Sequence, residues 1–198
     1  MSLRRSFALA TLLLAAPLAA QFQSEGYKFL QAIRDSKNND VITMLNRPGS
    51  TIVNTRDANS GDAALHITAR RGDAAYTTFL LQKGADPNIR DARNNTPMMA
   101  AVDAGRGNEM VPLLLLAKAN PNLGNASGET PLIRAVQRRD IALVRTLLAA
   151  KADPDQRDVI AGLSARDYAN RDARAAPIAK LLADTPRLTR PSVAGPKL

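Results

Sequence analysis

The chain has 198 residues, and its formal net charge is +9 at pH 7. It contains no cysteine and one histidine, which excludes disulfides, thiolate metal sites, a cysteine nucleophile and metal sites built from several histidines. Apolar residues make up 45% of the chain and aromatic residues 4%, without tryptophan, so we expect a buried core but no base-stacking platform for nucleic acid.

Residues 1–20 have the layout of a secretory signal peptide. Arg4 and Arg5 precede an apolar stretch over 7–18, and small residues before Gln21 offer a cleavage site. The apolar stretch has about twelve residues, whereas a membrane-spanning helix needs ~20, so we expect no membrane span. The segment predicts a mature protein that begins near Gln21 and is periplasmic or secreted in a bacterium.

Two short motifs recur along the rest of the chain. Copies of an apolar motif start 33, 34 and 34 residues apart, at Ala63, Thr96, Thr130 and Ser164. A turn motif that follows a pair of leucines recurs in phase, as KGADPN, AKANPN and AKADPD at 83–88, 117–122 and 150–155. Two landmarks that keep one period indicate a repeat protein.

Each repeat predicts two short helices. Thr96 and Thr130 are expected N-caps, and the prolines that follow them occupy the first helical position, where a missing N–H costs nothing. Helices of about eight to ten residues are too short to be stable alone. Their apolar faces therefore have to be buried by stacking against neighbouring units.

These motifs resemble the ankyrin repeat, a unit of about 33 residues with a β-turn and two helices. The TPLH box of that family is matched by AALH, TPMM and TPLI, and its GADxN loop by GADPN at 84–88. The resemblance implies an all-α solenoid of about five helix-turn-helix units joined by β-hairpin-like loops. Within a repeat domain at 21–184, we expect units at 26–56, 57–90, 91–124, 125–157 and 158–183. Residues 185–198 predict a Pro-rich, basic and disordered tail.

Three departures from the repeat pattern lead to specific expectations. Ala63 replaces the capping threonine, so the helix after it is expected to lack a side-chain N-cap. Pro112 lies near the start of a second helix and predicts a delayed or distorted start there. The hairpins at 57–63 and 158–164 each contain one extra residue.

The sequence predicts no enzyme. His66 occupies the fourth position of the TPLH-like box, where the resemblance implies a bracing hydrogen-bond role. No nucleophile elbow, P-loop, HExxH or GxGxxG pattern is present. We therefore expect no catalytic residues, no metal, no cofactor and no nucleic-acid partner.

The resemblance implies protein binding through the hairpin tips and the inner helix ends on a concave face. The candidate partner-binding residues at such positions are Asn59, Arg70, Arg71, Arg93, Asp103, Arg138 and Arg171. The alternative for the arginines is a solvated helix end or local pairing with interleaved aspartates.

The function predicted is that of a monomeric protein-binding module in the bacterial periplasm. It would act as a scaffold, or as an accessory or inhibitory factor, for an exported protein. The alternative is an electrostatic binder of an anionic envelope surface through the basic face and the tail.

Overall fold

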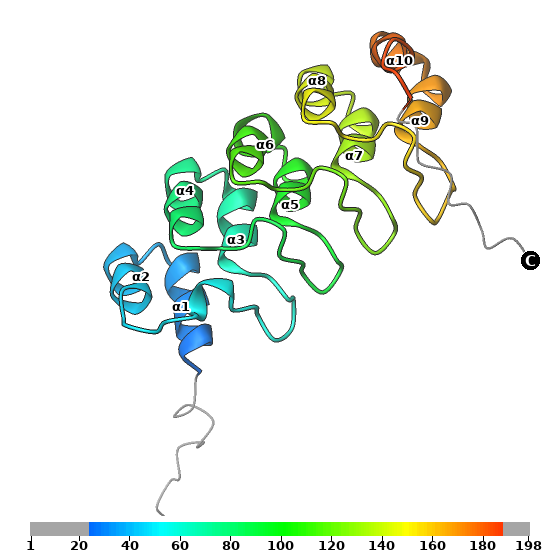
Figure 1. The fold of residues 1–198 in the computed structure, drawn as a ribbon. Coiled ribbons are helices and arrows are strands. Elements are labelled where there is room, and N and C mark those ends of the chain that lie inside the picture. Colours follow the sequence, from blue (N-terminus) through cyan, green and yellow to red (C-terminus); the bar gives the residue numbers. More distant parts are fainter. Residues whose placement is uncertain (1–23, 188–198) are drawn as a thin grey trace, which may run out of the picture.

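The computed structural model describes residues 24–187, which form an elongated array of paired helices (Figure 1). The predicted signal segment, and the tail beyond residue 187, lie outside the described residues. The inner row of helices contains α1 (Glu25–Arg34), α3 (Ala64–Arg71), α5 (Pro97–Asp103), α7 (Pro131–Gln137) and α9 (Ala165–Arg171). The outer row contains α2 (Asn38–Leu45), α4 (Ala74–Gln82), α6 (Gly107–Leu116), α8 (Ile141–Ala149) and α10 (Ala176–Ala183).

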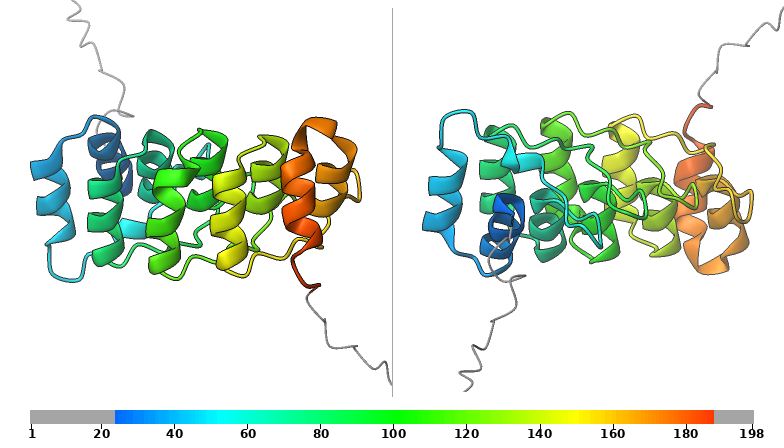
Figure 2. Two further views of the ribbon diagram at one scale, coloured as in Figure 1. Left: turned by 90° about the horizontal axis from the view of Figure 1, so that it is seen from above. Right: turned by 90° about the horizontal axis from the view of Figure 1, so that it is seen from below.

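Hairpin loops project from the inner row on the side away from the outer row (Figure 1). Figure 2 shows the outer helices in front when the array is seen from above, and the loops in front when it is seen from below. Residues 24–187 contain no extended strand, only two isolated antiparallel bridges, Arg56 with Ala63 and Arg157 with Ser164. The predicted all-α repeat solenoid is confirmed.

Side-chain caps start most of the short helices. Thr96 and Thr130 accept hydrogen bonds from the backbone N–H of Met99 and Ile133, both at 3.3 Å, as predicted for α5 and α7. The outer helices α4 and α8 start in the same way at Asp73 and Asp140. At Ala63 no side-chain cap exists, as expected from its missing hydroxyl.

The core lies between the two rows of helices and continues along the array. Outer helices α4, α6, α8 and α10 contain a fully buried leucine at equivalent positions, namely Leu80, Leu114, Leu147 and Leu182. Burial of a leucine side chain contributes about 1.5–3 kcal/mol. A cluster of Ala69, Ala101 and Met110 joins α3 to α5 and α6. Stacking of neighbours thus supplies the stability that the helices lack on their own.

The predicted delay at Pro112 is wrong, because α6 begins at Gly107 and continues through the proline to Leu116. A proline at this position removes the N–H that would bond to the carbonyl of Asn108, four residues earlier. Both Asn108 and Pro112 are exposed. Water can therefore reach the freed carbonyl, and Met110, Val111 and Leu114 stay buried on the opposite face.

Asparagine side chains connect successive units. Asn54 accepts the backbone N–H of Asp86 at 2.8 Å, and Asn88 accepts that of Asn120 at 2.7 Å. Asn122 repeats the contact on Asp153 at 2.7 Å. Each asparagine reaches the turn of the next unit, so these contacts fix the step from one unit to the next.

Backbone hydrogen bonds connect the hairpin tips in the same direction. The N–H groups of Ala92, Ala126 and Val159 donate to carbonyls of the preceding tip, at 3.0, 2.9 and 2.9 Å. The close approach requires glycine at Gly61, whose φ is +71°, because a Cβ there would lie 2.4 Å from the backbone nitrogen of Ala92. The tips therefore form one continuous row.

Candidate functional site

The row of hairpin tips is held in place by acidic or amide side chains at the start of each hairpin. Asp57 accepts the N–H groups of Asn59 and Ser60 at 2.9 and 3.0 Å, and Asp91 accepts that of Arg93 at 2.8 Å. The N–H of Ser60, and then the guanidinium of Arg34, hold the pKa of Asp57 far below its usual range. Such side-chain-to-backbone bonds fix the turns before any partner arrives.

Two predicted residues present free side chains on these tips. Asn59 and Arg93 are exposed, and neither side chain has a hydrogen bond or ion pair with any residue in 24–187. Both are therefore available to a partner, and the rigid backbone beneath them lowers the entropy cost of binding.

Three of the predicted residues meet in one hollow, which we call the central hollow. It has a volume of about 180 Å³. Its lining residues are Arg70, Arg93, Asn95, Ala100, Asp103 and Ala104. Arg70 is held by two hydrogen bonds to Asp62, at 2.9 and 3.2 Å. The hollow thus combines a fixed guanidinium, a free one and a carboxylate around two small alanines.

Asp103 connects the central hollow to the next unit. Its carboxylate lies 3.2 Å from Nε of Arg134, and Arg134 also lies 3.5 Å from Glu129. The backbone carbonyl of Asp103 accepts a hydrogen bond from the predicted residue Arg138 at 3.3 Å. Sequence reasoning missed Arg134, although its place in the box TPLIR puts it one turn before Arg138, which caps the same helix.

Arg71 points away from the hairpin row. Its guanidinium donates to the carbonyl of Ile33 at 3.0 Å and to the hydroxyl of Ser36 at 3.2 Å, at the end of α1. This gives Arg71 a structural role at the joint between α1 and α3. Its neighbour Arg70 faces the hollow, so the two adjacent arginines have different roles.

Arg171 lies apart from the central hollow, at the end of α9. Its exposed side chain has no hydrogen bond or ion pair with the described part of the chain. Other charged residues near the end of α9 are paired. Arg139, for example, forms an ion pair with Asp172 at 2.9 Å. Local pairing of arginines with interleaved aspartates, the alternative expected from the sequence, therefore describes much of this surface.

The last hairpin tip carries two residues that sequence reasoning missed. Val159 and Ile160 are 70% and 79% exposed. The signal was present in the sequence, because the turn residue Asp158 is followed here by two branched aliphatic residues. In the three earlier hairpins, the residue at this position is followed by alanine and then by a polar residue. These residues are Asp57, Asp91 and Asn125.

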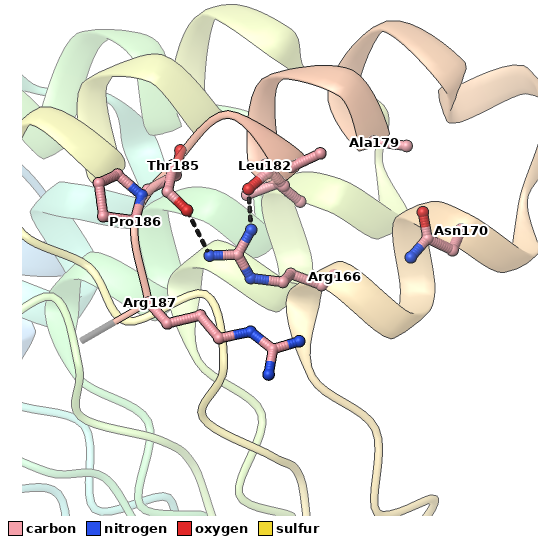
Figure 3. A pocket seen from close by; sticks show the side chains of 8 residues that line it. Arg166, Asn170, Ala179, Leu182, Thr185, Pro186 and Arg187 are labelled. Carbon is pink, nitrogen blue, oxygen red and sulfur yellow. Dashed lines mark hydrogen bonds between the residues drawn. The ribbon is translucent and has the colours of Figure 1, made fainter. Parts of the chain in front are cut away.

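A further hollow of about 400 Å³ lies at the C-terminal end of the described residues (Figure 3). Arg166 crosses it and donates to the carbonyls of Leu182 and Thr185, the latter at 2.7 Å, while its Nε bonds to Asp155 at 2.9 Å. These bonds occupy Arg166 and fix the end of α10. Arg187 lines the same hollow, with no hydrogen bond or ion pair inside 24–187.

Residues 24–187 contain no group of three His, Asp or Glu side chains arranged to hold a metal ion.

Among the described residues, no helix combines the length and the apolar character needed to cross a membrane.

Comparisons with known proteins agree with this architecture. The family model described as ankyrin repeats (3 copies) matches residues 29–125 and 65–158. Oxysterol-binding protein-related protein 1 of Homo sapiens is 34% identical over 86 residues, which are 43% of this chain and 8% of that protein. An ankyrin repeat protein of Fowlpox virus is 32% identical over 87 residues, 44% of this chain and 39% of the viral protein. Protein PhlB of Serratia liquefaciens is 47% identical over 51 residues, 25% of this chain and 22% of its own length.

Proposed function

The chain belongs to the ankyrin repeat family and forms a protein-binding module, and from this premise we propose that it binds an exported protein in the bacterial periplasm. In this proposal the module serves as a scaffold, or as an accessory or inhibitory factor, and acts without catalysis. The partner contacts the hairpin tips and the inner helix ends on the concave face.

The central hollow is the observation that carries this proposal. Arg93 offers a guanidinium with no partner in 24–187, and Arg70 offers one already positioned by Asp62. The alanines between them leave room for a side chain of the partner. A carboxylate fits this arrangement best, because guanidinium groups bind carboxylates through charge-assisted hydrogen bonds.

Retention of a partner from a periplasmic extract tests the proposal. The bait is the mature chain from Gln21 to Leu198, washed at low and at high salt. An Arg70→Ala/Arg93→Ala variant should lose a stoichiometric protein that the wild-type chain retains at high salt. The matched control is Arg145→Ala/Lys180→Ala, which removes the same charge from exposed positions on α8 and α10 and should retain the partner. Equal retention by all three proteins would contradict a role for the hollow.

Export is tested separately by the intact mass of the protein in its native host. We propose cleavage before Gln21, so the periplasmic fraction should contain a chain without residues 1–20. Recovery of the uncleaved chain from the cytoplasmic fraction would contradict this.

The alternative proposal is binding to an anionic envelope surface, and it is supported by exposed cations without partners in 24–187, such as Arg171 and Arg187. Removal of residues 188–198 tests it while Thr185 keeps its bond to Arg166. Under this alternative, the truncated chain binds anionic vesicles more weakly, and salt releases the full-length chain. Under the partner-binding proposal, the truncation leaves partner retention unchanged.

A further inference from the structure

The last hairpin tip differs from the other tips in chemistry. Earlier tips expose polar residues such as Asn59 and Arg93, whereas Val159 and Ile160 expose most of their aliphatic surface. Neither residue belongs to a buried cluster of the core. Single exposed apolar residues are common on proteins. Two adjacent ones at the end of a row of binding tips form a local apolar surface, which we call the apolar tip.

The backbone of the apolar tip is fixed by Asp158. Its carboxylate accepts the N–H groups of Ile160, Ala161 and Gly162 at 2.9, 2.6 and 3.2 Å. It also accepts the hydroxyl of Tyr168 at 2.7 Å. Burial alone would raise the pKa of Asp158, but these four donors hold the pKa below its usual range.

Two further contacts hold the sides of this hairpin. Arg157 donates across it to the carbonyl of Gly162 at 2.6 Å, and Val159 donates to Ser127 of the preceding tip at 2.9 Å. The two aliphatic side chains are therefore presented on a backbone that is already ordered. Little conformational entropy remains to be lost when they are buried, which favours binding.

Basic groups lie beside the apolar tip. Arg157 immediately precedes Asp158, and its side chain is 63% exposed. Arg157 and Arg187 line one hollow of about 420 Å³ at the base of this hairpin. Asp155 and Asp167 in the same hollow pair with Arg166 and Arg157, which leaves Arg187 without a partner in 24–187. The surroundings of the apolar tip thus complement an acidic surface.

We propose that Val159 and Ile160 are an aliphatic anchor that inserts into an apolar pocket of the partner protein, with a carboxylate of that protein beside Arg157 and Arg187. This inference rests on the proposed function and extends it to a second contact point. A protein pocket fits better than a lipid surface, because the tip contains no tryptophan or tyrosine of the kind that sits at membrane interfaces. The polar tips beside it also favour a protein surface.

The test measures the affinity of the protein retained in the experiment above, expressed and purified on its own. Binding to wild type is compared with binding to Ile160→Ser and to Val159→Ser. Loss of a buried aliphatic side chain should weaken the Kd about ten- to hundredfold for Ile160→Ser. The loss should be the same at low and high salt, because apolar burial is not screened by ions. The matched control Leu116→Ser removes an aliphatic side chain that is 80% exposed on the outer helix α6, away from the hairpin tips, and should keep the wild-type Kd.

The other outcomes separate the two proposals. If Arg70→Ala/Arg93→Ala weakens binding but Ile160→Ser keeps the wild-type Kd, the anchor is wrong and the central hollow stands. If the wild-type chain retains no protein, both are overturned. Binding to vesicles of phosphatidylglycerol and phosphatidylethanolamine that Ile160→Ser abolishes would assign the tip to lipid and overturn the anchor. Self-association in sedimentation experiments that Ile160→Ser abolishes would assign the apolar tip to contact with a second copy of the chain. This result would also overturn the anchor.

Discussion

The imidazole of His66 satisfies both of its hydrogen bonds in one protonation state. Its Nδ1 accepts the N–H of Ala63 at 3.1 Å, so the proton must lie on Nε2, which donates to the carbonyl of Asn95 at 2.9 Å. The ring is fully buried, and burial lowers its pKa below the ordinary value of 6.5. His66 also ties down the start of α3, because it accepts the N–H of Ala63, the residue that precedes this helix. This is the bracing role that the sequence implied.

The pH dependence of unfolding tests this residue. Since the pKa of His66 is lowered in the folded state, its contribution is complete above pH 6.5 and is lost as the pH falls below that value, where the unfolded chain takes up the proton first. His66→Ala should reduce the free energy of unfolding at pH 7.5 by about 1–3 kcal/mol, because it leaves buried polar groups unpaired. Its stability should also change less than that of wild type between pH 7 and pH 5. Urea unfolding at both pH values measures this, and a variant with wild-type stability and pH dependence would refute the assignment.

At the scale of the element, α6 tolerates a proline in its interior at an energetic cost. The outer row provides a comparison, since Pro112 lies in the sixth position of α6 whereas Pro177 lies in the first turn of α10. Only the first removes a hydrogen bond that the helix would otherwise make. The apolar residues of α6 are buried in spite of the lost hydrogen bond. Packing of this face therefore outweighs the tendency of Pro112 to interrupt a helix.

Pro112→Ala should therefore stabilise the protein. The substitution restores the N–H that bonds to the carbonyl of Asn108, and we expect an increase of about 1–3 kcal/mol in the free energy of unfolding. The control Pro177→Ala should be neutral or slightly destabilising, because it gains no such bond and the unfolded chain becomes more flexible. Denaturant midpoints of both variants give the comparison. A Pro112→Ala protein less stable than wild type would contradict this account of α6.

At the scale of the whole molecule, stability depends on contacts that each unit makes with its neighbours. Gly61 and Gly162 occupy equivalent positions, each four residues after the aspartate that starts its hairpin, and both have positive φ, +71° and +65°. A further tip covers Gly61, but no atom lies within 4 Å of a Cβ built at Gly162. Substitutions at these two glycines therefore distinguish the cost of backbone strain from the cost of losing the contact between tips.

Gly61→Ala should destabilise the protein more than Gly162→Ala. Both variants pay the strain of alanine at positive φ, roughly 1–2 kcal/mol. Only Gly61→Ala also forces the next tip away, because its Cβ would lie 2.4 Å from the nitrogen of Ala92. Thermal unfolding of the two variants measures the difference, and hydrogen exchange at Ala92 reports the loss of the tip contact. Equal melting temperatures would show that the contact contributes nothing.

The repeat made the fold predictable, while the binding surface was only partly so. A period kept by two motifs specifies which residues begin helices and which lie at tips, because these depend on local chemistry such as the caps at Thr96 and Thr130. It does not specify where a long side chain points. Arg70 and Arg71 are adjacent in sequence, yet one lines the central hollow and the other bonds to the end of α1. The direction of the Arg71 side chain depends on its hydrogen-bond acceptors, Ser36 and Ile33, which lie in the preceding unit.

The regular row of tips also affects how this surface can evolve. The central hollow belongs to α3 and α5 and the apolar tip to the hairpin before α9, with the unit of α7 and α8 between them (Figure 1). Because neighbouring units meet through the same repeated backbone contacts, duplication of that intervening unit would keep the contacts of both sites with the units beside them. It would change only their separation. The number of units thus sets the distance between the two sites, and an added unit fits the protein to a longer partner without a change in either site.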